Sequence, residues 1–361
     1  MTNRELEIMA LIKENPMISQ KDIGEILGIT RSSVGVHLAN LMKKGFIKGK
    51  GYILDDAPYV VVIGGSNMDI LGTPMDALVF EDSNPGKISL SLGGVARNIA
   101  ENLVKLDIRA KLLSVVGNDV YGEKILNECK AQGIDMEHVQ KINGVSTSVY
   151  LSILDDTGNM KLALSDMDIT GHIDKEYINS NSEIIKNAQY VVVDTNLEED
   201  IINYLVNNFK GPKFILDTVS AHKAKKVKDI IGKFHVIKPN RIESEVITGI
   251  VISDMESIEK TFRYYDEKGV DNVILSLGKE GVAYKKDNQV RIYKNPEVKV
   301  INANGAGDTF TAAIVYSILN GMDIEETVKF SSTAAMVTLK SKDTISDNLS
   351  VDLVNKMMEE I

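Results

Sequence analysis

Cysteine is almost absent from this sequence of 361 residues, since Cys129 is the only one. A single thiol excludes an internal disulfide and a zinc site built on clustered cysteines, and it fits a reducing compartment such as the cytoplasm. Long apolar runs are also missing: none approaches 18 residues, so we expect no membrane span. The first residues mix acidic and basic side chains with apolar ones, which is not the pattern of a signal peptide.

An excess of positive charge is missing too, because the formal net charge is −10. This argues against a chain that coats nucleic acid along its whole length. The charge is uneven, however: residues 1–54 carry eight Lys or Arg against five Asp or Glu, a balance of +3, which leaves −13 for the rest. We therefore expect two domains with different partners, a small one at residues 1–55 and a large one at residues 56–361.

Three helical patterns fill residues 1–45. The second begins at Ser19 and the third at Thr30, both good N-cap residues, and a glycine ends each of them. Residues 46–54 predict two short strands around a turn of Lys and Gly. Helix, helix, turn, helix and hairpin is the order of a winged helix-turn-helix domain.

The stretch ISQKDIGEILGITRSSVGVHLANLMKKGFI resembles such domains in bacterial regulators. In them the third helix enters the DNA major groove and nearby lysines contact phosphates. The candidate base-reading residues are Arg31, Ser32, Ser33 and His37, and the candidate phosphate contacts are Lys43, Lys44, Lys48 and Lys50. The segment could instead serve dimerisation or docking. One module of charge +3 would bind DNA weakly, so specific binding favours a homodimer.

From Tyr59 onward, short runs rich in Val and Ile alternate with helical segments. Strands are expected at residues 59–63, 111–116, 190–193, 213–216, 235–237 and 273–277. Continuous apolar runs are typical of strands buried on both faces, so the fold class is α/β with a mainly parallel sheet between helices. Residues 87–92 and 146–164 alternate or carry turn signals, and they predict a small antiparallel sheet that projects as a lid.

The strongest chemical signal lies at residues 300–310, VINANGAGDTF. We expect a strand, a turn at Gly305, Ala306 and Gly307, and then a helix, so that backbone N–H groups converge at the positive end of the helix dipole. Such a turn would stabilise a phosphoryl group that gains negative charge. Asp308, in the first helical turn, could accept a proton from a substrate hydroxyl. Taken alone, the segment could also be an ordinary strand, turn and helix.

Two further segments offer polar groups for a substrate. Gly93 and Gly94 follow a predicted strand and open a helix that contains Asn98, whose amide can hold hydroxyl groups. Asn67 and Asp69 lie near the carboxyl end of the first predicted strand, where α/β sheets place ligands. A carboxylate such as that of Asp69 suits the two hydroxyls of a sugar diol.

A fourth segment offers groups for a nucleotide. Asn240 and Glu243 lie one helical turn apart, and an amide and a carboxylate so placed can organise the water shell of Mg²⁺ on a nucleotide. The sequence contains no GxxxxGK[ST] motif, so a P-loop is not expected.

The segments GGSNMD, GGVARN, KPNRIE and NANGAGD, in this order, resemble the ribokinase-like, or PfkB-type, carbohydrate kinases. The resemblance covers roughly residues 58–361. It implies an α/β/α sandwich with a β lid, and transfer of the γ-phosphoryl of ATP to a primary hydroxyl of a sugar or nucleoside. It further implies a base at Asp308, an anion hole at residues 305–307, a sugar site at Asn67, Asp69, Gly93, Gly94 and Asn98, and an Mg-ATP site at Asn240, Glu243, Ser276, Gly278 and Gly281, with no direct protein ligand to the metal.

Two departures from the family pattern bear on cofactor and substrate. Asn302 and Ala303 stand where many members have Asp and Thr that help to form a monovalent-cation site, which weakens the case for activation by K⁺. Val95 stands where ribokinases proper often have Lys, which weakens the case for ribose as substrate.

A finer resemblance, in GGSNMDI, GGVARNIAENL and the LSDMDI stretch around Asp166, is to the pseudouridine kinases, some of which carry an N-terminal winged helix. It implies phosphorylation of the 5′-hydroxyl of pseudouridine. A buried carboxylate could accept the additional ring N–H of that base, and Asp166 is the candidate, although it could instead cap a turn or be solvated. One alternative is a kinase for another sugar or purine nucleoside, such as ribose, adenosine or inosine. Another is a transcriptional regulator whose kinase-like domain only senses a ligand.

Overall fold

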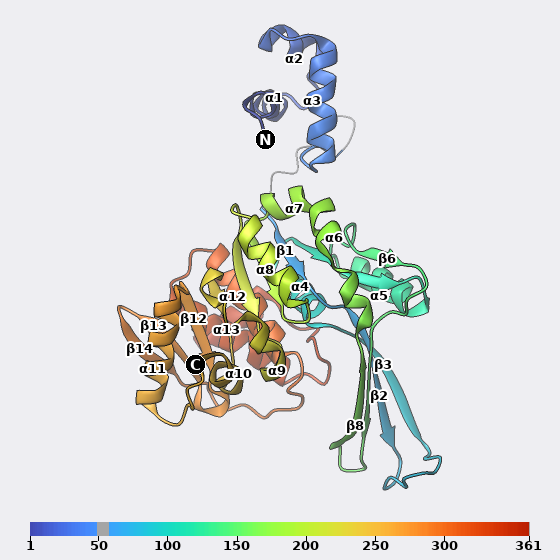
Figure 1. Ribbon diagram of the computed structural model, residues 1–361, viewed down its shortest axis with the longest axis vertical. Helices are drawn as coiled ribbons and strands as arrows, with labels where there is room; N and C mark the ends of the chain where they lie inside the picture. The colour runs from blue at the N-terminus through green and yellow to red at the C-terminus, as the bar shows by residue number, and fades with distance from the viewer. Residues whose placement is uncertain (49–57, 361) are drawn as a thin grey trace. The chain divides into compact units, whose positions relative to one another are not determined.

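The computed structural model describes residues 1–48 and 58–360 (Figure 1). Contacts divide the chain into two compact units. Among the described residues, the first contains residues 1–48 and 58 together with the short helix α7 (Ser182–Asn187), and the second contains residues 59–181 and 188–360. None of the helices in the described ranges is both long enough and apolar enough to cross a bilayer.

The first unit contains the three predicted helices, α1 (Asn3–Glu14), α2 (Gln20–Leu27) and α3 (Arg31–Lys43). The predicted N-caps are confirmed, since the Ser19 and Thr30 side chains each accept a backbone N–H of the first helical turn. One apolar cluster joins the helices: Ile8, Met9, Ile12, Ile18, Ile23, Val34, Leu38, Leu41 and Ile47. Residues 49–54 of the predicted hairpin, with Lys50, lie outside the described residues.

An eight-stranded sheet forms the centre of the second unit. In spatial order its strands are β14 (Gln289–Tyr293), β13 (Val282–Lys286), β12 (Asn272–Ser276), β11 (Val236–Ile237), β10 (Lys213–Asp217), β9 (Tyr190–Asp194), β1 (Val60–Ile63) and β4 (Ala110–Leu113). The strands from β12 to β4 are parallel, and β13 and β14 add an antiparallel hairpin. Every residue of β1 and β9 is buried, as expected of apolar strands that are covered on both faces.

Helices cover both faces of this sheet, so the fold is the expected α/β/α sandwich. One apolar core joins the sheet to α4 (Val95–Lys105), α12 (Ala306–Leu319), α13 (Ile324–Leu339) and α14 (Val351–Glu359). The unit also contains α5 (Val120–Ala131), α6 (Lys175–Ser180), α8 (Glu199–Asn208), α9 (Ala221–Ala224), α10 (Arg241–Thr248) and α11 (Met255–Lys268). A small parallel pair, β5 (Val115–Gly117) and β6 (Gln140–Ile142), lies apart from the main sheet.

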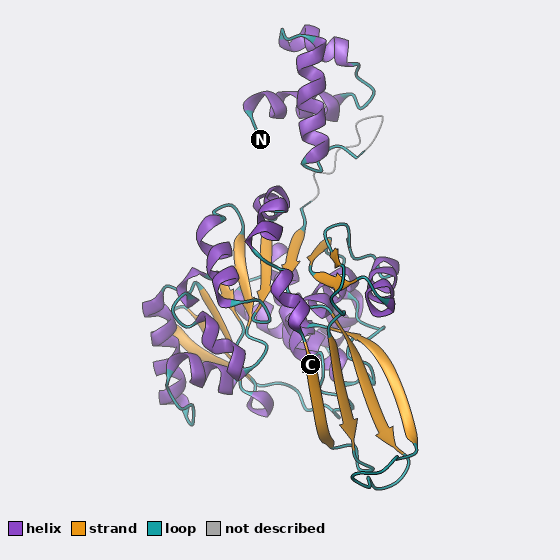
Figure 2. Ribbon diagram, turned by 45° about the vertical axis from the view of Figure 1, so that its right-hand side comes forward, coloured by secondary structure: helices purple, strands orange, loops and turns teal. Residues whose placement is uncertain are grey.

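A four-stranded sheet projects from the sandwich as the predicted lid (Figure 2). Its strands, in spatial order, are β3 (Gly86–Gly93), β2 (Asn67–Pro74), β7 (Val149–Leu154) and β8 (Met160–Asp166). Strand β2 was not anticipated: Asn67 and Asp69 were expected beside the end of the first strand, and they begin a lid strand instead. The lid is also not purely antiparallel, because β2 and β7 run parallel.

The two faces of the lid differ in polarity, because side chains alternate across a sheet. Strand register sets Ile70 beside Leu90 and Leu151, and Leu151 beside Leu164, on one face. The next row on this face contains Ile88, Ile153 and Leu162, and Leu162 is 53% exposed. The opposite face carries Asp69, Ser91, Tyr150 and Ser165 in one row. The lid therefore has one polar face and one exposed apolar face.

The strand expected before the Gly-Ala-Gly turn is wrong. Residues 294–305 form no strand, and Val300 and Ile301 are half-exposed. The segment is held by α13 instead, because the backbone N–H of Ile301 donates to the carbonyl of Leu339 at 2.8 Å. Val300 and Ile301 have the apolar composition of a strand, but in the described structure they pair with no sheet edge.

Candidate active site

The predicted motifs meet at one edge of the main sheet. Strands β1, β9, β10, β11 and β12 all end there, because parallel strands place their carboxyl ends together. Helices α4 and α12 pack against each other and begin at the same edge. Residues from four distant segments of the chain therefore surround one site.

Asp308 lies in the first turn of α12 and faces α4. Its Oδ2 accepts a hydrogen bond from Nδ2 of Asn98 at 2.6 Å, although 210 positions separate the two residues. The helix begins at Gly305, which has a positive φ of 78° and offers no side chain to cap the first N–H groups. A Cβ at Gly305 would overlap the carbonyl of Thr344. The first turn therefore keeps backbone donors that an anion can use.

Lys238 is a residue of this site that the sequence analysis left without a role. It follows β11, and its Nζ lies 3.2 Å from Oδ2 of Asp217 and 3.4 Å from the carbonyl oxygen of Gly307. Burial alone would lower the pKa of this amine, but the nearby carboxylates of Asp217, Glu243 and Asp308 outweigh it and raise the pKa. A permanent positive charge therefore lies beside the predicted anion hole.

The carboxyl group of Asp308 lies in an environment that changes its acidity. Burial, with a further contribution from the negative charge of Asp217, raises its pKa well above the usual aspartate value. The hydrogen bond from Asn98 and the charges of Lys238 and Arg97 oppose this rise. A raised pKa makes the carboxylate a stronger base than an exposed aspartate, which suits removal of a hydroxyl proton.

A second polar cluster lies at the root of the lid. Nδ2 of Asn67 donates to Oδ1 of Asp69 at 2.6 Å, and burial raises the pKa of Asp69, while Asn67 and Arg97 oppose that rise. Gly93 is paired with Asn67 across the strands, and a Cβ there would overlap both side chains. Gly94, with φ of 100°, begins α4 so close to the backbone of residues 65–66 that a Cβ would overlap it.

Asp166 does not join this cluster, which corrects the prediction of a buried carboxylate. It is exposed at the end of β8, and its partner in register is Val149, which in turn pairs with buried Met68. This row alternates with the row of Asp69, so Asp166 lies on the apolar side of the lid. Ser165, next to it, lies on the side of Asp69.

Asn240 and Glu243 form a reciprocal capping box at the start of α10. The Asn240 side chain accepts the N–H of Glu243 at 2.9 Å, and Glu243 accepts from the backbone and side-chain nitrogens of Asn240, each at 2.8 Å. Thr218 donates to the same carboxylate at 2.6 Å. Glu243 is buried while Asn240 is exposed, so Glu243 holds Asn240 in place and Asn240 faces outward.

The predicted nucleotide turn lies beside this cap. Ser276, the last residue of β12, forms a parallel bridge with Asn240. The turn contains Gly278, with φ of 65°, and Gly281, with φ of 117°, and the N–H of Leu277 donates to Gly281 at 2.9 Å. These positions therefore belong to one neighbourhood with the α10 cap.

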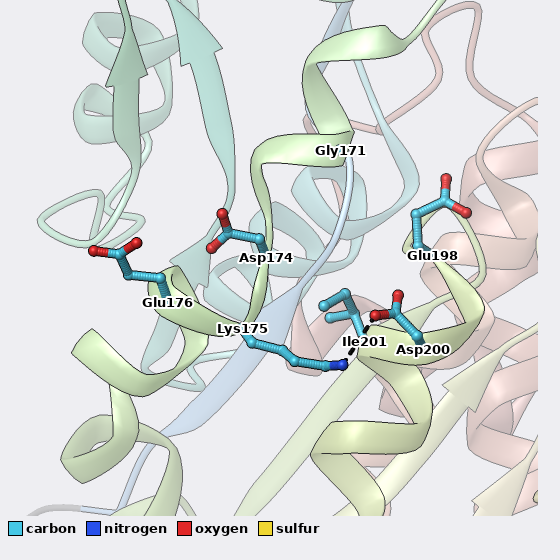
Figure 3. A pocket seen from close by; sticks show the side chains of 7 residues that line it. All are labelled: Gly171, Asp174, Lys175, Glu176, Glu198, Asp200 and Ile201. Carbon is cyan, nitrogen blue, oxygen red and sulfur yellow. Dashed lines mark ion pairs between the residues drawn. The ribbon is translucent and has the colours of Figure 1, made fainter.

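An open pocket elsewhere in the second unit contains none of the predicted site residues (Figure 3). Four acidic side chains and Lys175 surround it, and Lys175 points toward Asp200 at 3.2 Å. Asp174 caps α6, and Glu198 precedes α8, so helix starts account for much of this acidity. We assign the site to the sheet edge and not to this pocket.

In the first unit, the candidate base-reading residues lie on α3 with unequal exposure. Arg31 and Ser32 are exposed, whereas Ser33 is half-buried and its N–H donates to Thr30 at 3.2 Å. His37 is half-buried, and its Nδ1 has no hydrogen-bond partner among the described residues. The exposed face continues instead through Val36, which is 61% exposed, Ala39 and Lys43.

Lys44 differs from the other predicted phosphate contacts. Its Nζ lies 3.0 Å from Oε2 of buried Glu5, so this lysine stabilises the fold of the unit. Burial by itself would raise the pKa of Glu5, but the hydrogen bonds from Thr2 and Lys44 lower it on balance. We therefore count Lys44 as a structural residue.

A helix start that no side chain caps, a lysine, a carboxyl group with a raised pKa and a polar cluster lie at this sheet edge, and such an arrangement suits phosphoryl transfer. The comparisons with known families agree: residues 57–350 match the pfkB family of carbohydrate kinases, and residues 1–48 match the winged helix-turn-helix DNA-binding family. The chain belongs to the pfkB family, and it is an ATP-dependent kinase with an N-terminal winged helix-turn-helix domain.

Three individual relatives are similar to this chain over most of their length. The pseudouridine kinase of Escherichia coli K12 is 36% identical over 83% of this chain and 96% of its own length. The uncharacterized sugar kinase YeiI of the same organism is 34% identical over 98% of both chains, so the similarity extends through both domains. A Clostridium perfringens protein solved as a candidate sugar kinase has 38% identity and a TM-score of 0.77, over 84% of this chain and 96% of its own.

The assignment of Asp308 as catalytic base predicts a specific kinetic defect. Asp308→Asn keeps the size and the contact with Asn98 but cannot accept a proton, so we expect kcat to fall by about 10²-fold or more while ATP binding stays nearly unchanged. Steady-state kinetics and nucleotide titration test this. Asp174→Asn, at the cap of α6, is the matched control and should retain full turnover. A variant of Asp308 that keeps most of its turnover would contradict the assignment.

Proposed function

We propose that this kinase phosphorylates the 5′-hydroxyl of pseudouridine. The observation that carries the proposal is the 36% identity to a pseudouridine kinase over nearly the full length of that relative. The ribose would lie with its 2′ and 3′ hydroxyls on Asp69 and Asn98, and its 5′-hydroxyl would then face Asp308. Lys238 and the N–H groups of residues 305–307 would stabilise charge on the transferred phosphoryl group.

The nucleotide would occupy the region beside α10. ATP would lie against the turn of Ser276, Gly278 and Gly281, and its Mg²⁺ would be held through water by Asn240, with Glu243 fixing that side chain. When bound, the metal neutralises charge on the phosphates. The residues fit this role, because Asn240 offers an exposed amide two positions from Lys238, whose Nζ contacts the uncapped start of α12, and such a place suits a hydrated cation on a polyphosphate. The substitutions at Asn302 and Ala303 give no support for K⁺.

Base recognition would fall to the polar face of the lid. Pseudouridine has one more ring N–H than uridine, so an added acceptor is needed to select it. Ser165 and Tyr150 share the row of Asp69 and therefore lie on the side of the substrate cluster. A hydroxyl acceptor on this face replaces the role first given to Asp166.

Substrate preference tests this proposal. We expect kcat/KM to favour pseudouridine over uridine, ribose, adenosine and inosine, because a site with an unpaired acceptor disfavours analogues that lack the donor. Ser165→Ala should reduce the preference for pseudouridine over uridine, whereas Asp166→Ala, one residue away on the other face, should leave it unchanged. Better turnover of ribose or a purine nucleoside would favour the alternative of another sugar or nucleoside kinase. Turnover of none would favour a ligand sensor.

The chain would act as a homodimer that pairs through the lid. The apolar face of the lid exposes Ile88, Leu90, Leu162 and Leu164, and a monomer rarely leaves such a contiguous patch open to water. A second copy suits it, because a two-fold axis brings the same apolar face against itself. A dimer would also carry two N-terminal domains, and two are needed for specific DNA binding if each one alone binds weakly.

Leu162→Asp should therefore convert a dimer into a monomer, since it places a charge on an exposed part of the apolar face, on the edge strand β8. Light scattering coupled to gel filtration measures the change. Ala163→Asp places the same charge on the adjacent residue, which points to the opposite face, and should leave the dimer intact. A wild-type protein that is monomeric at micromolar concentration would rule out this interface.

The N-terminal domain would bind duplex DNA. Arg31 and Ser32, at the start of α3, would contact base edges, and Val36 would contact a thymine methyl group. The exposed face that continues to Lys43 supports this orientation. A role in dimerisation or docking is the competing interpretation.

Gel shifts with the full chain distinguish these interpretations. Binding should weaken as salt rises, because lysine–phosphate contacts release counterions. Arg31→Ala should weaken binding to a selected sequence about tenfold and affect random duplex less. Arg4→Ala removes an equal charge from the first turn of α1, where it pairs with Glu7, and serves as the control. No shift at low salt with either DNA would support docking.

A further inference from the structure

Arg97 is a buried cation in α4 that neither the motifs nor the catalytic assignment explain. Its side chain is only 3% exposed. On one side, Nη1 donates to Oε2 of Glu101 at 2.6 Å. Glu101 is itself buried. A buried charge is costly unless its hydrogen bonds are satisfied, so the remaining partners of the guanidinium indicate what it does.

One partner is the side chain of Asn98. Nη2 of Arg97 donates to Oδ1 of Asn98, and the same amide donates through Nδ2 to Asp308 at 2.6 Å. An amide rotated by half a turn would set its NH₂ against the guanidinium and its oxygen against the carboxylate, and both contacts would be repulsive. Arg97 therefore fixes the orientation in which Asn98 donates to the base.

The other partners are the last carbonyls of lid strand β3. Nη2 donates to Leu92 at 2.5 Å and Nε donates to Gly93 at 3.3 Å. Gly93 touches the Asn67 and Asp69 pair, because a Cβ there would overlap both side chains. The same guanidinium therefore holds both the end of β3, beside which the Asn67 and Asp69 pair lies, and the amide that contacts Asp308.

We propose that Arg97 is a positioning residue that fixes the diol site at Asp69 relative to the base Asp308, by holding the Asn98 amide and the end of β3 with one guanidinium. The identity of these two sites rests on the proposed function. Lysine could supply the charge but not the planar set of donors, so Arg97→Lys should restore electrostatics without restoring geometry.

Several charged groups act on the carboxylates of Asp308 and Asp69, and Arg97 acts on both of them. Asp308 faces Asp217 from β10, Lys238 after β11, and Arg97 and Asn98 from α4. Asp69 faces Asn67 on its own strand and Arg97 from α4. Arg97 lowers the pKa of each carboxyl group, so its removal should raise both. The acidic limb of kcat/KM, which requires ionised Asp308, would then move to higher pH.

Kinetics of Arg97→Gln and Glu101→Gln provide the matched test. Both break the same ion pair, but only Arg97→Gln frees Asn98. We expect Arg97→Gln to lower kcat about tenfold or more, to raise KM for the nucleoside but not for ATP, and to shift the acidic limb upward. Arg97→Lys should restore the pH of the acidic limb to its wild-type value but should not restore kcat. Glu101→Gln should change thermal stability alone. Equal kinetics and equal pH profiles in Arg97→Gln and Glu101→Gln would overturn the proposal.

A second measurement does not depend on the substrate. In the free full-length protein labelled with ¹³C at aspartate Cγ, the Asp308 signal is assigned by its loss in Asp308→Asn, and its titration gives the pKa directly. Arg97→Gln should raise that pKa, and Arg97→Gln/Glu101→Gln covers the case in which the single variant does not fold. An unchanged Asp308 titration refutes the role of Arg97, whereas a changed titration in a protein that ignores pseudouridine refutes only the substrate.

Discussion

The hydrogen bond between Asn98 and Asp308 is the contact on which the site depends. It joins two helices, α4 and α12, that begin at the same sheet edge and pack side by side above β1 and its neighbours. A helix that slid by one turn would carry its first residues about 5.4 Å away, beyond hydrogen-bond reach. The apolar core beneath these helices thus sets the position of Asp308, so packing far from the candidate site determines whether the proposed base can reach a substrate hydroxyl.

Charge balance is the second constraint, because the site gathers carboxylates that would repel one another. Asp217 raises the pKa of Asp308, and both carboxylates, with Glu243, raise the pKa of Lys238. Removing such charges from water costs several kcal/mol each unless partners satisfy them. Lys238, in the loop after β11, and Arg97, in the first turn of α4, supply the compensating positive charges. A phosphate that arrives at α12 would therefore meet donors already fixed in place, with little reorganisation needed.

The sequence predicts those parts of the fold and site that depend on local pattern. Apolar runs identify the parallel strands, the caps at Ser19 and Thr30 identify two helix starts, and the glycines at residues 93–94 and 305–307 mark the turns that begin α4 and α12. What it misses depends on partners distant in the chain. Val300 and Ile301 have the composition of a strand but no sheet edge to pair with, and α13 holds them instead.

Side-chain direction and buried ion pairs are harder to predict for the same reason. Asp166 and Ser165 are neighbours in sequence, yet strand register places them on opposite lid faces, and register comes from pairing with β7. Lys238 lies inside a recognised motif, but its role follows from Asp217, which is 21 positions away on another strand. Arg97 likewise looks like an ordinary surface residue of an amphipathic helix until the lid strand is placed against it.

The same geometry bears on whether the kinase-like domain senses a ligand or transforms it. A sensor needs the polar cluster at Asn67 and Asp69, and it needs some motion of the lid. It gains nothing from a carboxylate that burial holds at a raised pKa beside a lysine and an uncapped helix start, and that arrangement costs stability. These features suit a step in which a hydroxyl loses its proton as a phosphoryl group arrives. Catalysis is therefore the function that accounts for this destabilising arrangement of buried charges. Any regulatory role of the N-terminal domain would be added to it.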